Sequence, residues 1–227
     1  MVRACWRAGL ALALAPLTLG ASSSWATPPV AASNSPTIAA VTTPRGVVPF
    51  RGSFRVSATW CASTGESHGT PAIDFVMPIG TPVYAAGAGS VDYTSNDPRN
   101  CNPSKHIPPG GSYAQGIQWC VDHGMVGIRI RIRHDDGTFT MYVHLSEIRT
   151  GITASPSSRV RKGQLIGWSG NSGISTGPHL HFSRINTAGT ATIDPGILRA
   201  CWNGRVHDYV NLKSLRGTIV RNDGYSC

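Results

Sequence analysis

The sequence lacks an apolar run long enough to cross a bilayer comfortably. The longest run, Ala8 to Leu19, falls short of the roughly 20 residues that a membrane-spanning helix needs. It follows the basic residues Arg3 and Arg7 and precedes Ser24-Trp25-Ala26, a small-x-small pattern typical of signal peptide cleavage. We therefore predict a signal peptide over residues 1–26, cleaved after Ala26, and an exported protein without a transmembrane segment.

Acidic residues are scarce, with 11 Asp and Glu against 20 Lys and Arg. Removing Arg3 and Arg7 with the signal peptide lowers the formal net charge only from +9 to +7. A basic surface favours polyanionic partners, which include nucleic acid, an anionic membrane and an anionic cell wall. Charge alone does not choose among these three.

A convincing helical period and internal repeats are also missing. Short strands punctuated by Gly and Pro instead predict an all-β fold with an antiparallel β-sheet domain. In residues 126–134 isoleucines alternate with arginines, so one face is apolar. The other face carries Arg129, Arg131 and Arg133, which are either a solvated strand face or a contact for an anionic substrate. A turn at Asp135-Asp136-Gly137 leads into a partner strand over residues 138–144.

The composition also predicts how the chain is divided. Residues 27–45 are rich in Pro, Ala, Ser and Thr with hardly a charge, so they are a flexible linker. The main domain follows over residues 46–199, with a long irregular connection in residues 94–120. Residues 200–227 are a C-terminal appendage.

Export permits disulfides, and five cysteines remain after Cys5 is removed with the signal peptide. Cys101–Cys120 and Cys201–Cys227 are the predicted pairs, because each would close a segment that has little other support. Cys61 would then be buried and free, or paired between chains.

One stretch carries the clearest functional signal, a Gly-rich loop from Gly170 that enters a short strand ending in His179-Leu180-His181-Phe182. Side chains alternate along a strand, so His179 and His181 face one way while Leu180 and Phe182 face the core. One imidazole can bind a metal while the other reaches a group held on that metal. Taken by itself, the pattern also fits a strand with two incidental histidines.

Three motifs in one order add to this signal. They are Ala72-Ile73-Asp74-Phe75 followed by Pro78-Ile79-Gly80-Thr81-Pro82-Val83-Tyr84-Ala85-Ala86, then Tyr142-Val143-His144-Leu145, then Gly177-Pro178-His179-Leu180-His181-Phe182. Together they resemble the lysostaphin-type zinc endopeptidases that cut bacterial peptidoglycan, over roughly residues 66–185. The resemblance implies an open groove that holds one Zn²⁺ per chain.

The resemblance also implies the site residues. The metal ligands would be His68, Asp74 and His181, and His144 and His179 would be the unligated catalytic pair. The commonest family pattern places the first histidine four residues before the aspartate, where this chain has Thr70; His68 lies six before it. Glu66 is the alternative ligand if His68 points away.

The resulting hypothesis is a secreted or periplasmic bacterial zinc metalloendopeptidase, a monomer, that hydrolyses stem-peptide or cross-bridge bonds of peptidoglycan. One alternative is a catalytically inactive wall-binding or activator module of the same fold. A secreted protease that acts on Gly-rich proteins such as elastin would use the same site. A nucleic-acid binder that uses the three arginines is disfavoured, because aromatic residues interleave poorly with them.

Overall fold

The computed structural model describes residues 46–58, 72–209 and 216–227. All described residues belong to one compact unit. The predicted signal peptide and linker, Cys61, Glu66 and His68 lie outside the described residues. The domain boundaries therefore stay predictions. In the described part of the chain, no helix is both long and apolar enough to span a membrane.

Strands dominate the described residues. They are β1 (Gly46–Val47), β2 (Gly52–Ala58), β3 (Ile73–Val76), β4 (Pro82–Tyr84), β5 (Gly89–Asn96), β6 (Asn100–Cys101), β7 (Ile128–His134), β8 (Phe139–Ile148), β9 (Ser155–Val160), β10 (Leu165–Ser169), β11 (Gly173–Ile174), β12 (Leu180–Ile185), β13 (Thr192–Ile193), β14 (Leu198–Trp202), β15 (Arg205–Tyr209) and β16 (Ile219–Asn222). The helical elements are a 3-10 turn, η1 (Pro103–Lys105), and α1 (Tyr113–Asp122). The predicted all-β class is confirmed.

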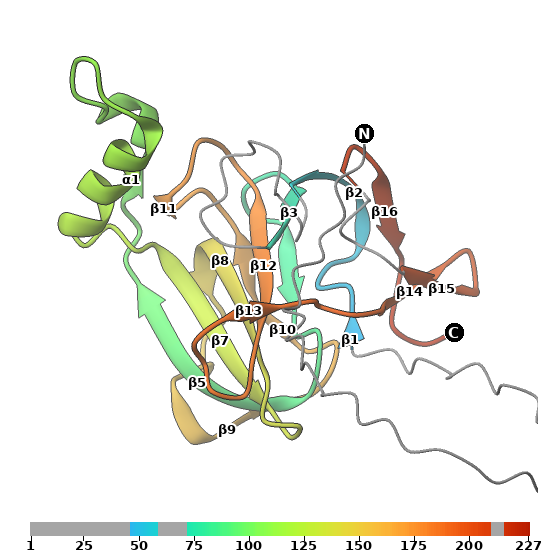
Figure 1. The fold of residues 1–227 in the computed structure, drawn as a ribbon. Helices are drawn as coiled ribbons and strands as arrows, with labels where there is room; N and C mark the ends of the chain where they lie inside the picture. The colour runs from blue at the N-terminus through green and yellow to red at the C-terminus, as the bar shows by residue number, and fades with distance from the viewer. Residues whose placement is uncertain (1–45, 59–71, 210–215) are drawn as a thin grey trace, which may run out of the picture. The chain divides into compact units, whose positions relative to one another are not determined.

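The main sheet has eleven strands among the described residues, and its path runs β16-β2-β3-β12-β8-β7-β5-β9 (Figure 1). Strands β4, β10 and β13 join it beside this path. Its pairings are antiparallel, as the alternating sequence predicts. Strand β12 lies at the centre, between β3 and β8, so the His-x-His motif enters the middle of the sheet.

One face of the central strands forms the core. Ile130 and Ile132 of β7, Tyr142 of β8 and Leu180 of β12 are fully buried in one apolar cluster, and Phe182 is 1% exposed. Neighbouring residues on these strands point to the opposite face, because side chains alternate along a strand. The core therefore fixes which residues the second face presents.

Residues 97–124 form a side structure between β5 and β7 that includes β6, η1 and α1. The prediction of an irregular connection is wrong here, because α1 is a ten-residue helix. Its start is stabilised by the Ser112 amide, which donates to Gln115 Oε1 at 2.7 Å. Gly116 permits close packing, since a Cβ there would lie 2.2 Å from the Pro103 carbonyl oxygen. The helix was missed because a ten-residue segment shows too little apolar periodicity.

Both predicted disulfides, Cys101–Cys120 and Cys201–Cys227, are confirmed. The first ties β6 to α1, and β6 pairs in parallel with β11 of the Gly-rich loop. Figure 1 shows α1 and β11 side by side. The second disulfide joins β14 to the last residue of the chain. Near that end, β16 pairs with β2 at the edge of the main sheet.

Candidate active site

Three strands place polar groups in one row on the face opposite the core. Asp74 of β3 pairs with His181 of β12, and His181 pairs with Val143 of β8. Directly opposed residues on antiparallel strands share a face, so Asp74 and His181 lie next to each other. The flanking residues Phe75 and Phe182 face the core. The row is therefore built by ordinary strand alternation.

His144 joins this row through a β-bulge. Ile128 pairs with Leu145 and Ile130 pairs with Tyr142, so two residues of β8, Val143 and His144, lie opposite the single residue Arg129. The backbone of His144 has φ 65°, in the left-handed region that non-glycine residues rarely adopt. Without the extra residue, alternation would point His144 into the core beside Tyr142. The bulge instead turns its imidazole toward the row, a use typical of bulges at functional sites.

The imidazole of His144 is held by the Gly-rich loop. Its Nδ1 donates to the Ser172 carbonyl at 2.7 Å, which leaves Nε2 as the acceptor nitrogen. The ring centroid lies 4.5 Å from that of His179 and 5.7 Å from that of His181. Burial, followed by the charges of His179 and His181, lowers the pKa of His144 to about 3. The side chain is therefore neutral at neutral pH.

His179 is oriented in a similar way. Its Nδ1 donates to the Gly177 carbonyl at 2.7 Å, and its Nε2 lies 3.4 Å from Asp74 Oδ2. His181 presents the opposite nitrogen, with Nδ1 3.1 Å from Asp74 Oδ1. The side chains of both histidines are 14% exposed and that of Asp74 is 8% exposed. All three side chains are thus mostly buried, and each keeps a small exposed part.

The donor set fits a divalent metal of the zinc type. Two ligands on one tetrahedral zinc lie about 3.3 Å apart, given bonds of about 2.0–2.1 Å. The 3.1 Å between Asp74 Oδ1 and His181 Nδ1 is close to that separation. The ligand nitrogens of His144, His179 and His181 lie within 4.8 Å of one another, so an all-histidine set is a second grouping. A set of Asp74 and His181 needs a third ligand, and the predicted one, His68, is outside the described residues.

Asn100 supports the loop that holds His144 and His179, and sequence reasoning missed it. Its Nδ2 lies 2.6 Å from the Asn171 carbonyl oxygen and 3.2 Å from that of Ser175. Between these two residues Ser172 bonds to β7 and β8: its Oγ accepts from the Ile128 amide at 2.8 Å and donates to the Leu145 carbonyl at 2.7 Å. Nothing in the sequence around Asn100 indicates this role, because it depends on the pairing of β6 with β11.

The histidines outside the motifs lie elsewhere. His106 and His123 stack on the two faces of Trp119, with centroid distances of 3.6 and 3.7 Å. His134 Nδ1 bonds to the Ala88 carbonyl at 2.8 Å, and His207 is an exposed residue of β15. The structure thus brings together Asp74, His144, His179 and His181, the described members of the predicted set.

An antiparallel sheet that gathers imidazoles and a carboxylate on one face provides what a metal-dependent hydrolase needs. The chain belongs to peptidase family M23, whose family model matches residues 68–195, more than half of the chain. This confirms the family that the three motifs indicate.

Two curated relatives illustrate the similarity. The peptidoglycan DD-endopeptidase ShyA of Vibrio cholerae is 38% identical over 112 residues, which are 49% of this chain and 19% of that protein. Lysostaphin of Staphylococcus simulans is 33% identical over 114 residues, which are 50% of this chain and 17% of that protein. The matched part is about a fifth of these relatives' length.

Among solved structures, a zinc containing peptidase from Vibrio cholerae resembles the chain with a TM-score of 0.46 and 24% sequence identity. The likeness covers 68% of this chain and 39% of that one.

Proposed function

We propose that the protein is a secreted or periplasmic zinc endopeptidase that hydrolyses peptide bonds of bacterial peptidoglycan. The observation that carries this proposal is the row in which Asp74 and His181 face the acceptor nitrogens of His144 and His179. The names of the two curated relatives, a peptidoglycan DD-endopeptidase and lysostaphin, support the substrate class. The basic charge of the chain suits an anionic wall.

We assign Asp74, His181 and His68 as ligands of one zinc ion per chain. The motif resemblance implies this set, and the 3.1 Å between Asp74 Oδ1 and His181 Nδ1, close to the ligand separation on zinc, supports two of its members. Nδ1 of His181 is directed at the same space as Asp74, whereas His144 and His179 both use Nδ1 to donate to loop carbonyls. Their Nε2 atoms are left as acceptors, which suits proton transfer.

A bound zinc ion would act as a Lewis acid, which would polarise the peptide carbonyl and lower the pKa of water. His144 and His179 move the protons: one takes a proton from the attacking water and passes it to the leaving amine, while the other, when protonated at Nε2, supports the developing oxyanion. The loop carbonyls of Ser172 and Gly177 hold both rings in one tautomer. Core residues on the other face, Tyr142 of β8 and Phe182 of β12, pack these two strands in place beneath the rings.

The test is incubation of the purified protein with isolated peptidoglycan, with and without chelator, while free amines and reducing sugar ends are measured. New amines without reducing ends, lost on chelation and restored by zinc, are the expected result. Tight binding to the wall with no amines released would contradict the proposal. It would indicate the inactive wall-binding module instead.

A further inference from the structure

Arg129 lies in the same row as the candidate site. It is the single residue of β7 opposite the bulge at Val143 and His144, and on its other side it pairs with Ser95 of β5. Its neighbours Ile128 and Ile130 face the core, so its side chain extends from the face that carries His181 and Asp74. A cationic side chain therefore borders the site one strand beyond His144.

The charge of Arg129 is not neutralised by the protein. No acidic group pairs with it among the described residues, and its Nε is buried without a hydrogen-bond partner. Its guanidinium lies over the ring of Tyr93, 5.5 Å from the centroid, which orients it without satisfying its donors. Leaving a buried donor unpaired costs stability, so this arrangement is expected where a ligand completes it.

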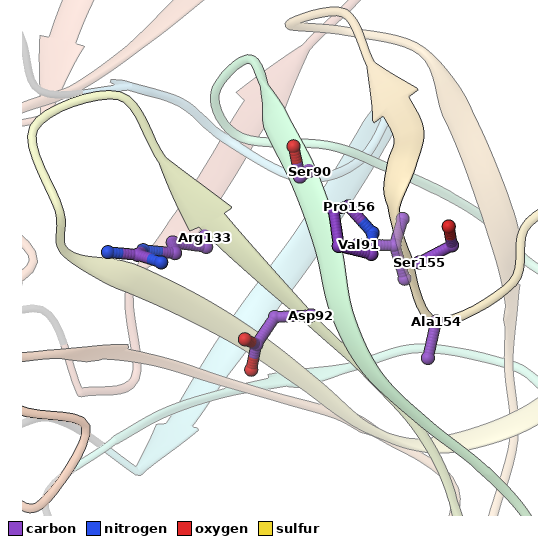
Figure 2. A pocket seen from close by; sticks show the side chains of 7 residues that line it. All are labelled: Ser90, Val91, Asp92, Arg133, Ala154, Ser155 and Pro156. Atoms are coloured by element: carbon purple, nitrogen blue, oxygen red, sulfur yellow. The ribbon is translucent and has the colours of Figure 1, made fainter.

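The neighbouring arginines on β7 differ. Arg131 pairs with Asp92, to which its Nε donates at 2.6 Å. Arg133 is exposed and lies with Asp92 beside a pocket of about 210 Å³ that Ser90 and Pro156 also line (Figure 2). Arg133 pairs with Phe139, toward the opposite end of β8 from the bulge. Of the three arginines on β7, Arg129 is the half-buried one that lies beside the candidate site and has no acidic partner among the described residues.

The spacing defines where on a substrate Arg129 can act. His181 and Arg129 are separated by two strand spacings, about 10 Å between their Cα atoms. An extended peptide advances about 3.3–3.6 Å per residue. The guanidinium lies over Tyr93 of β5, on the side of β7 away from His181, so an extended peptide whose scissile carbonyl lies beside Asp74 and His181 would bring to it a group about three or four residues away. A planar guanidinium with several donors is suited to bidentate binding of a carboxylate.

We propose that Arg129 binds a carboxylate of the peptide substrate about three or four residues from the bond that is cleaved, so that the protein selects carboxylate-bearing peptides. The inference rests on the proposed function, because it assumes a peptide lying across this row. It assigns Arg129 a specificity role and no part in the bond cleavage.

The test compares isolated peptidoglycan with the same material after its carboxyl groups have been converted to amides by carbodiimide and ammonia. Arg129→Gln is expected to lower kcat/KM on the untreated wall by about 10- to 100-fold, the size of a lost charged hydrogen bond. On the amidated wall the loss should shrink to a few-fold. Arg129→Lys, which keeps the charge without the bidentate fork, should restore part of the rate.

Arg133→Gln is the matched control, since it removes the same charge from the same face of the same strand. It should leave both rates nearly unchanged. Equal losses for Arg129→Gln and Arg133→Gln, or equal losses of Arg129→Gln on both walls, would overturn the proposal and indicate general attraction to anionic wall polymers. Two synthetic peptides, amidated only at the C-terminus or only at side chains, then identify which carboxylate is bound.

A binding measurement separates this inference from the proposed function. The chelator-treated protein is titrated with a soluble stem peptide in its free-acid and fully amidated forms. Preference of the wild type for the free acid, lost in Arg129→Gln, supports the inference even if the wall is not cleaved. Cleavage without any such preference overturns the inference alone.

Discussion

The two faces of strands β3, β12 and β8 are made from alternate residues of the same segments, yet they depend on different features. The core face needs only apolar side chains at every second position, as with Phe75 and Phe182. The site face needs the register of three strands and one bulge, because Asp74, His181 and His144 come from separate strands. Stability and chemistry should therefore respond to different substitutions, even at adjacent residues.

The largest effect on chemistry relative to stability is expected from substitutions of the four polar residues of the site. His144→Ala and His179→Ala should keep zinc but lower turnover by about 10²- to 10⁴-fold, because proton transfer is lost. His181→Ala and Asp74→Ala should lose the metal itself. Zinc content by elemental analysis and the rate of amine release check this, with His207→Ala as the control histidine. Equal zinc and equal rate in all four variants would remove the site assignment.

Substitutions on the core face should instead lower stability while zinc binding and turnover are kept. Phe182→Ala, one residue from His181, should lower the free energy of unfolding by about 3–5 kcal/mol, because it leaves a cavity in the core. The protein that remains folded should keep its zinc and its turnover. Denaturant unfolding, with metal content and rate measured on the folded fraction, tests both. Loss of metal in fully folded Phe182→Ala would show that the two faces are not separable.

His144, a residue of the site face, should also make the stability of the protein depend on pH. Its pKa is lowered from its ordinary value near 6.5 to about 3 on folding, so the folded state binds fewer protons between these values. Its contribution is therefore complete above pH 6.5 and is lost as the pH falls toward 3. Between pH 7 and 4 the chelator-treated wild type should lose about 1–3 kcal/mol more unfolding free energy than His144→Gln. Parallel curves for the two proteins would contradict this.

A smaller effect is expected from the support of the Gly-rich loop. Asn100→Ala removes a donor to the Asn171 and Ser175 carbonyls and should lower turnover by roughly 3- to 30-fold while zinc is kept. A change in kcat more than in KM is expected, because the loop positions His144 and His179. Asn96→Ala, an exposed residue at the end of β5, is the control. If both variants behave alike, Asn100 has no positioning role.

Sequence patterns predicted what depends on single strands. The Ile-Arg alternation of β7 and the same-face placement of His179 and His181 each need only a local period, and the motif resemblance added Asp74 and His144. The bulge at His144 was not predictable, because it is defined by the register against β7. Asn100 was missed for the same reason, since its partners belong to a loop that is remote in sequence. The short helix α1 was missed because its ten residues show too little apolar periodicity, although Ser112 and Gln115 form a capping box at its start.

The pairing of β3 with β12 has a consequence for when the candidate site forms. Asp74 and His181 are far apart along the chain and meet only when these strands join in register. Such distant pairings close large loops and form slowly compared with local hairpins such as β7 and β8. A nascent or partly folded chain therefore has no assembled site. The proposed hydrolysis would therefore require this pairing, which can form only after both strands have been synthesised.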